Sequence, residues 1–167
     1  CTIARMNPPT PGHMSLITHM IKEAVKFNVP QIFLILSNVD DNNEDPMPCD
    51  KNPNAPDSNF KTEIIDSMVA KLQQNLGTNV SVICRCVPKI RGPTGNKLSI
   101  FSVLSDIIYK DFGDIPNLNL IMFVGDDRAD LLDSVTNAYY LKKDNLGSMN
   151  GIATERDENM TTYKNYS

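Results

Sequence analysis

The chain has 167 residues, of which 41% are hydrophobic and 22% are charged, the balance of a soluble globular protein with a core of its own. Its net charge of -4 disfavours general nucleic-acid binding, because proteins that bind nucleic-acid backbones are usually basic. No apolar run approaches the ~20 residues that span a bilayer, so we expect no membrane helix. No signal peptide is recognisable and the first residue is Cys1, so we expect one domain, residues 1–167, truncated at one or both ends.

The first half of the chain predicts two strand–helix units. Residues 2–6 are expected to form a buried strand and residues 13–27 a helix, because apolar side chains recur there at helical spacing. Residues 31–37 are a continuous apolar run, typical of a parallel strand buried on both faces. A second helix is expected over 60–76, with Ser58 as its candidate cap.

The second half continues the alternation. Strands are expected over 80–87 and 119–124, with a weaker strand over 151–154, and helices over 100–109 and 129–137. Strands alternating with helices predict an α/β fold, a Rossmann-like doubly wound parallel sheet of about five strands with helices on both faces.

Three connections should meet at one edge of this sheet. The turn at 7–13, the loop after residue 37 and the turn at 125–128 all follow strands, and ligands of such sheets lie at the carboxyl ends of the strands. The loop 38–59 is rich in Asp, Asn and Pro. It lacks the spacing of a calcium loop, so a solvated loop is the favoured interpretation.

The four cysteines are expected to be reduced. Cys84 and Cys86 are two apart in a predicted strand, so they share a face and are too close in sequence for an easy mutual bridge. There is no C-x-x-C pair, which disfavours a zinc site. Reduced thiols are the usual state in an intracellular protein.

The stretch Arg5-Met6-Asn7-Pro8-Pro9-Thr10-Pro11-Gly12-His13 joins the first strand to the first helix. Its three prolines and its glycine predict a tight and rigid connection. His13 falls where the helix begins, so an imidazole lies beside backbone N–H groups and the positive end of a helix dipole. This arrangement suits a phosphate.

Thr10-Pro11-Gly12-His13 resembles the (His or Thr)-x-Gly-His signature of the nucleotidylyltransferase superfamily, which is often preceded by Asn-Pro, as Asn7-Pro8 is here. The superfamily includes adenylyltransferases for nicotinamide nucleotides and pantetheine phosphate, and cytidylyltransferases for phospho-alcohols. The position of the motif, after a predicted strand and before a predicted helix, strengthens the resemblance.

Further segments resemble a viral and phage branch of this superfamily. Lys51-Asn52-Pro53, followed by Lys61, is similar to its Lys-Asn-Pro loop, and Gly125-Asp126-Asp127-Arg128 is similar to its Gly-Ser-Asp-Arg turn. Ala153-Thr154-Glu155-Arg156-Asp157 resembles a later segment of the branch. The second signature of the superfamily, of the Ser-Ser/Thr-x-x-Arg type, is not in the 167 residues, and we expect it after Ser167.

The resemblance implies an adenylyl- or cytidylyltransferase. A phosphate of the acceptor would attack the α-phosphate of ATP or CTP and release pyrophosphate, without a covalent enzyme intermediate. His13 would donate to the α-phosphate, Thr10 would give a second polar contact, and Lys51 would be a further cation at the phosphates. Mg²⁺ would be bound through the triphosphate. The nucleotide-binding residues implied are Asn7, Pro9, Gly12, Gly125, Asp127 and Arg128.

The expected partners are a nucleoside triphosphate and a small phosphorylated acceptor, with a homo-oligomer or a viral assembly as a further expectation. The expected location is the cytoplasm, for a cellular, virus-encoded or virion-associated protein. Two alternatives stay open: a binding or structural protein that keeps the fold without turnover, and a flavodoxin-like module that would not need His13. His19, inside the first helix, is predicted to be structural.

Overall fold

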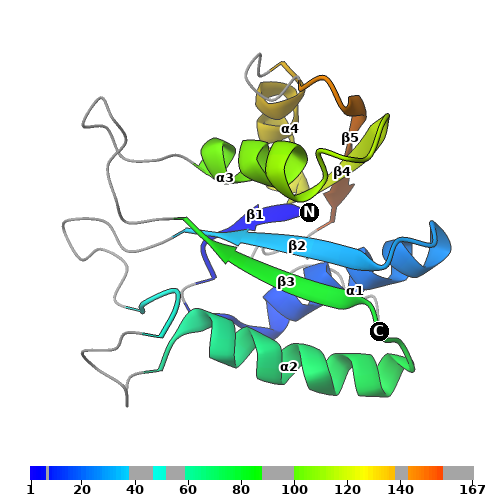
Figure 1. Cartoon of the computed structure of the whole chain (residues 1–167). Helices are drawn as coiled ribbons and strands as arrows, with labels where there is room; N and C mark the ends of the chain where they lie inside the picture. Colours follow the sequence, from blue (N-terminus) through cyan, green and yellow to red (C-terminus); the bar gives the residue numbers. More distant parts are fainter. Residues whose placement is uncertain (7, 38–46, 52–58, 88–99, 138–142, 156–167) are drawn as a thin grey trace.

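The computed structural model describes residues 1–6, 8–37, 47–51, 59–87, 100–137 and 143–155 (Figure 1). Five parallel strands form one sheet in the order β3-β2-β1-β4-β5, which confirms the predicted Rossmann-like α/β fold. The strands are β1 (Thr2–Ala4), β2 (Gln31–Leu36), β3 (Ser81–Cys86), β4 (Leu118–Gly125) and β5 (Leu146–Thr154). The helices are α1 (Pro11–Lys26), α2 (Lys61–Leu76), α3 (Ile100–Asp106), the π-helix η1 (Ile107–Asp111), the 3-10 turn η2 (Asp126–Arg128) and α4 (Ala129–Thr136).

Helices cover both faces of the sheet, with α1 and α2 on one side and α3 and α4 on the other (Figure 1). The alternation of side chains along β2 builds a core on each side. Ile32 and Leu34 pack with Ile17 of α1 and its neighbours, whereas Phe33 and Ile35 pack in the second core, below α3 and η1. None of the described helices is long and apolar enough to cross a membrane.

The last strand is longer than predicted. β5 has nine residues and pairs with β4 along its whole length, around an irregularity at Leu118 and Asn119. Its glycines hid the strand pattern in the sequence, and Gly151 has a packing reason. A Cβ there would lie 2.6 Å from the side chain of Leu132, so α4 packs too closely on β5 for any larger residue without displacing that side chain.

Two other details differ from the prediction. The helix predicted over 100–109 changes at Ile107 into a π-helix. The N-cap of α2 is Phe60, which makes no side-chain capping bond, and the predicted cap Ser58 lies outside the described residues. The first turn of α2 is instead held by the chain before it, because the N–H of Lys61 donates to the carbonyl of Pro48 and the N–H of Thr62 to that of Cys49.

A disulfide contradicts the expectation that all cysteines are reduced. Cys49, fully buried, is bonded to Cys86 at the end of β3, with a Cα–Cα distance of 6.0 Å. The sequence could not show this pairing because 37 positions separate the two residues. Cys84 is free, and burial raises the pKa of its thiol to about 12, so it is a poor nucleophile.

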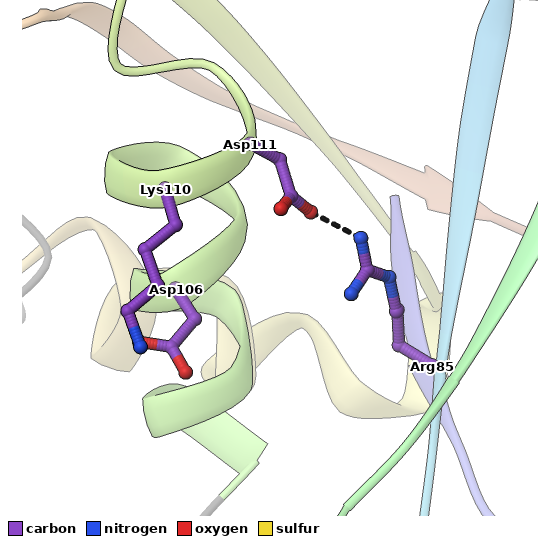
Figure 2. A network of polar contacts seen from close by, with 4 residues as sticks. All are labelled: Arg85, Asp106, Lys110 and Asp111. Carbon is purple, nitrogen blue, oxygen red and sulfur yellow. Dashed lines mark hydrogen bonds and ion pairs between the residues drawn. The ribbon is translucent and has the colours of Figure 1, made fainter.

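Surface charges connect β3 to η1 on the α3 side of the sheet. Arg85 donates to the carboxylate of Asp111 (Figure 2). One helical turn apart, Nζ of Lys110 lies 3.4 Å from Oδ1 of Asp106. The guanidinium of Arg85 also lies 5.9 Å from the ring centre of Phe33. Because both ion pairs are solvent-exposed, they contribute little stability, about 0–1 kcal/mol each.

Candidate functional site

The order of the strands places a crevice between β1 and β4. From β1 the chain proceeds to β2 on one side, and β4 lies on the other side, so the connections that leave these two strands diverge. Ligands of doubly wound sheets bind outside the carboxyl ends of strands at such a reversal. The chain that follows β1 leads into α1, and the chain that follows β4 leads into η2 and α4.

A pocket of about 120 Å³ lies at this point. Three of its lining residues can carry positive charge: Arg5 after β1, His13 in the first turn of α1, and Arg128 at the end of η2. None of the described lining residues is acidic, although the chain as a whole has a net charge of -4. The pocket therefore favours an anion. The remaining lining residues are Thr2, Ile3, Ala4, Met6, Leu16, Val124, Gly125 and Leu131.

His13 is held by the residue that caps its own helix. Thr10 is the N-cap of α1, and its hydroxyl accepts from the backbone N–H of His13 at 3.4 Å. In return the backbone N–H of Thr10 donates to Nδ1 of His13 at 3.1 Å, so the pair forms a capping box with His in the place that Glu or Gln usually takes. Nδ1 of the imidazole is thus held by Thr10.

The chain before His13 is shaped by its prolines and by one left-handed residue. Pro11 is the first residue of α1, a position where the missing N–H of proline costs nothing. Met6 has a φ of 47° and is almost completely buried, so the chain turns sharply after β1 with its side chain in the core. A non-glycine residue in this conformation is uncommon and costs backbone energy, so the packing around its buried side chain must hold it there.

The second half of the pocket comes from the end of β4. Gly125 is the last residue of that strand, and the 3-10 turn that follows brings Arg128 to the pocket. Both were predicted to bind the nucleotide, and both line the same pocket as His13. The side chain of Asp127 lies outside the described part of the chain.

Arg5 is a site residue that the sequence analysis did not select. It lines the pocket directly after β1, at the start of the segment that contains the motif. A signal was present in the sequence, because a cation one residue beyond the carboxyl end of a central strand lies at the edge where ligands of this fold bind.

The other predicted residues do not line the pocket. Thr10, Pro9 and Gly12 belong to the turn and first residues of α1 that support His13, with Pro9 buried and Thr10 exposed. Lys51 is exposed at the surface and is not among the described lining residues. Asn7 lies outside the described residues.

Lys61 has a position that its place in the sequence did not predict. Its side chain is fully buried, and its ammonium donates to the carbonyl of Ser37, the residue after β2, at 3.1 Å. The N–H of Ser37 donates in turn to the carbonyl of Ala4 at the end of β1. Lys61 therefore joins α2 to the carboxyl edge of the sheet, next to the pocket but outside its lining.

His19 has the structural environment predicted for it. Its Nδ1 lies 3.0 Å from the hydroxyl of Thr154. Its ring packs edge-on against the ring of Phe123, with 5.4 Å between the ring centres. Burial lowers its pKa, although the carboxylate of Glu23 opposes that shift. His19 therefore connects α1 to β4 and β5.

Within the described ranges, no three His, Cys, Asp or Glu side chains come together as a metal site. Comparisons with protein-family models, with curated proteins and with solved structures found no match. The resemblance to nucleotidylyltransferases therefore rests on the residues of the chain and on the place that the fold assigns to them.

Proposed function

We propose that the chain is a nucleotidylyltransferase, which transfers a nucleoside monophosphate from ATP or CTP to a small phosphorylated acceptor and releases pyrophosphate. One observation carries this proposal. His13 and Arg128, from two motifs more than 100 positions apart, line one cationic pocket at the strand reversal, and both motifs were selected for their resemblance to this superfamily.

The size of the pocket fits part of such a substrate. At about 120 Å³ it is smaller than the ~300–1,000 Å³ typical of whole-ligand pockets. A phosphate group is the part of a nucleotide that needs a small cationic site. In our proposal the α-phosphate region lies in the pocket, and the base and the acceptor lie along the carboxyl edge of the sheet.

The chemistry needs positioning and charge stabilisation. An oxygen of the acceptor phosphate attacks the α-phosphorus, a new P–O bond forms, and the bond to the oxygen that bridges to the β-phosphate breaks. The attacking oxygen is already anionic, so no general base is required. His13 would donate to a non-bridging α-phosphate oxygen, while Arg5 and Arg128 would stabilise the negative charge there.

Mg²⁺ is part of the proposal as a companion of the triphosphate. Since the described side chains form no cluster of metal ligands, the phosphate oxygens would supply most of the coordination. When bound, the ion supplies charge neutralisation to the phosphates. Lys51, which is exposed and is not among the described lining residues, has no role in this proposal.

We propose a cytoplasmic site of action, where nucleoside triphosphates are available, for a cellular or a virus-encoded enzyme. The disulfide is unusual for that reducing compartment. Burial of Cys49 limits access of an attacking thiol to that sulfur, whereas Cys86 is half-buried.

The test is release of pyrophosphate from ATP and from CTP, in the presence of Mg²⁺, against a panel of phosphorylated acceptors. We expect release with one nucleotide and one acceptor class. Triphosphate binding by calorimetry without release under any condition would support the alternative, a binding or structural protein with this fold. If the protein neither bound a triphosphate nor released pyrophosphate, both the transferase proposal and this alternative would be refuted.

A further inference from the structure

The contacts of His13 identify which of its ring nitrogens carries the hydrogen. A backbone N–H can only donate, so the contact from the N–H of Thr10, at 3.1 Å, makes Nδ1 an acceptor. A neutral imidazole has one donor and one acceptor nitrogen. The hydrogen of the neutral His13 ring is therefore on Nε2.

We propose that Thr10 is a positioning residue that holds His13 in the Nε2–H tautomer, so that the ring offers a donor to the anion in the pocket. The tautomer follows from the contacts alone. Only the use of the Nε2–H group, as a donor to phosphate, rests on the proposed function.

The hydroxyl of Thr10 is compatible with the same tautomer. Its oxygen accepts from the N–H of His13 at 3.4 Å and lies 3.0 Å from Nδ1. In the Nε2–H tautomer the hydroxyl can donate to Nδ1, which then accepts from both the hydroxyl and the N–H of Thr10. With a hydrogen on Nδ1, the ring would instead face the N–H of Thr10 donor against donor.

The neighbouring prolines set the backbone for this contact. A residue before proline is driven out of the helical region, and Thr10, which precedes Pro11, has φ -128° and ψ 164°. This extended conformation is the one an N-cap requires. Pro9, on the other side of Thr10, is buried and has a fixed φ, so the chain enters Thr10 from a restrained residue.

The consequence for an anion site is direct. An Nε2–H group donates to a phosphate oxygen, whereas the opposite tautomer would turn a lone pair towards it. This role differs from the direct phosphate contact expected for Thr10 from the resemblance. The side chain of Thr10 is engaged with His13, and Thr10 is not among the described residues that line the pocket.

The tautomer can be read by long-range ¹H–¹⁵N correlation on protein with labelled histidine. The chain contains two histidines, so a His13→Gln variant assigns both sets of signals. At about pH 8.5, above the ordinary imidazole pKa of about 6.5, we expect Nε2 of His13 to be protonated and Nδ1 to be unprotonated. Protonated Nδ1, or an even mixture, would overturn the proposal.

Two variants test the part played by residue 10. Thr10→Ser keeps the hydroxyl and should leave the tautomer and triphosphate binding within about twofold of wild type. Thr10→Asp also keeps a good N-cap, but its carboxylate accepts strongly and should draw the hydrogen to Nδ1. Unchanged Nε2 protonation in Thr10→Asp would show that the side chain of residue 10 does not set the tautomer.

Binding of ATP or CTP by the same variants separates the two proposals. We expect Thr10→Asp to bind at least about tenfold more weakly than Thr10→Ser. If the tautomer switches while binding is unchanged, the positioning role stands and the phosphate contact of His13 is wrong. If wild type shows the Nδ1–H form, the positioning role fails whatever the protein binds.

Discussion

Two pockets lie at opposite edges of the same sheet and differ in chemistry. The one at the carboxyl edge, about 120 Å³, is lined by Arg5, His13 and Arg128. The one at the amino edge is larger, about 490 Å³, and its lining is mainly apolar, with Phe27 of α1 and Phe33 of β2 among its residues. The smaller pocket is the one with the groups that bind phosphate.

The difference shows that volume alone does not identify a functional site. The amino-edge pocket is lined by the first residues of β2 and β4, together with apolar side chains of α1 and η1. The carboxyl-edge pocket follows from the reversal of strand order, which brings polar side chains from distant segments together.

The two linings also differ in their charged side chains. Among the described residues, the amino-edge pocket has one charged side chain, the acidic Glu23. An apolar site with a carboxylate is unsuited to a phosphate. We therefore expect substitutions at the two edges to have separable effects.

The largest effect is expected at His13. His13→Ala removes a transition-state donor and should lower turnover at least about 10²-fold. His13→Gln and His13→Glu both allow a standard capping box, so they should fold equally well. Only Gln can donate a hydrogen bond, so Gln should retain more activity than Glu in a pyrophosphate-release assay. Equal activity of the two variants would contradict the donor role.

The disulfide should matter for stability. Cys49→Ala with Cys86→Ala removes the link between the segment before α2 and the end of β3, and should cost about 2–4 kcal/mol of the free energy of unfolding. Denaturant unfolding measures this loss. Cys84→Ala, on the same strand but outside the disulfide, is the matched control, and an equal loss in it would argue against a special role of the bridge.

A pair of substitutions compares the two edges directly. Arg128→Met should weaken triphosphate binding about tenfold or more, because a hydrogen bond to a charged group contributes about 1.5–3 kcal/mol. Its stability should change little, since Arg128 is exposed. Ile32→Val, in the amino-edge pocket, should lower stability by about 0.5–1.5 kcal/mol and leave binding unchanged. Calorimetry measures binding and denaturant unfolding measures stability. If Ile32→Val weakened triphosphate binding and Arg128→Met did not, the functional edge would have been misassigned.

The smallest effect concerns pH. Burial lowers the pKa of His19 below its ordinary value of 6.5, so the unfolded chain binds the proton more readily than the folded chain. The contribution of this residue to stability is therefore complete above pH 6.5 and is lost as the pH falls below it. His19→Gln should reduce the fall in unfolding free energy between about pH 7 and 5. If the unfolding free energy of His19→Gln fell as steeply with pH as that of wild type, burial would not lower the pKa of His19.

The sequence predicted the fold well because its signals are local. The apolar run over Gln31–Leu36 and the Pro-Pro-Thr-Pro-Gly turn each specify structure within a few residues. It also selected His13, Gly125 and Arg128, which line one pocket.

The sequence missed features that depend on contacts between distant residues. Two such features are the Cys49–Cys86 bond and the burial of Lys61, which arise only when distant segments meet in the fold. The sequence also did not show that Lys51 is exposed and outside the described lining of the pocket, because that too depends on contacts between distant residues.

The most direct test of the central claim is a map of backbone amide signals by nuclear magnetic resonance as ATP or CTP is added with Mg²⁺. The account predicts that the signals of His13 and Gly125 move with one of these nucleotides, while those of Phe27 and Phe33 at the amino edge stay in place. Movement confined to the amino edge, or no movement at either edge, would contradict it.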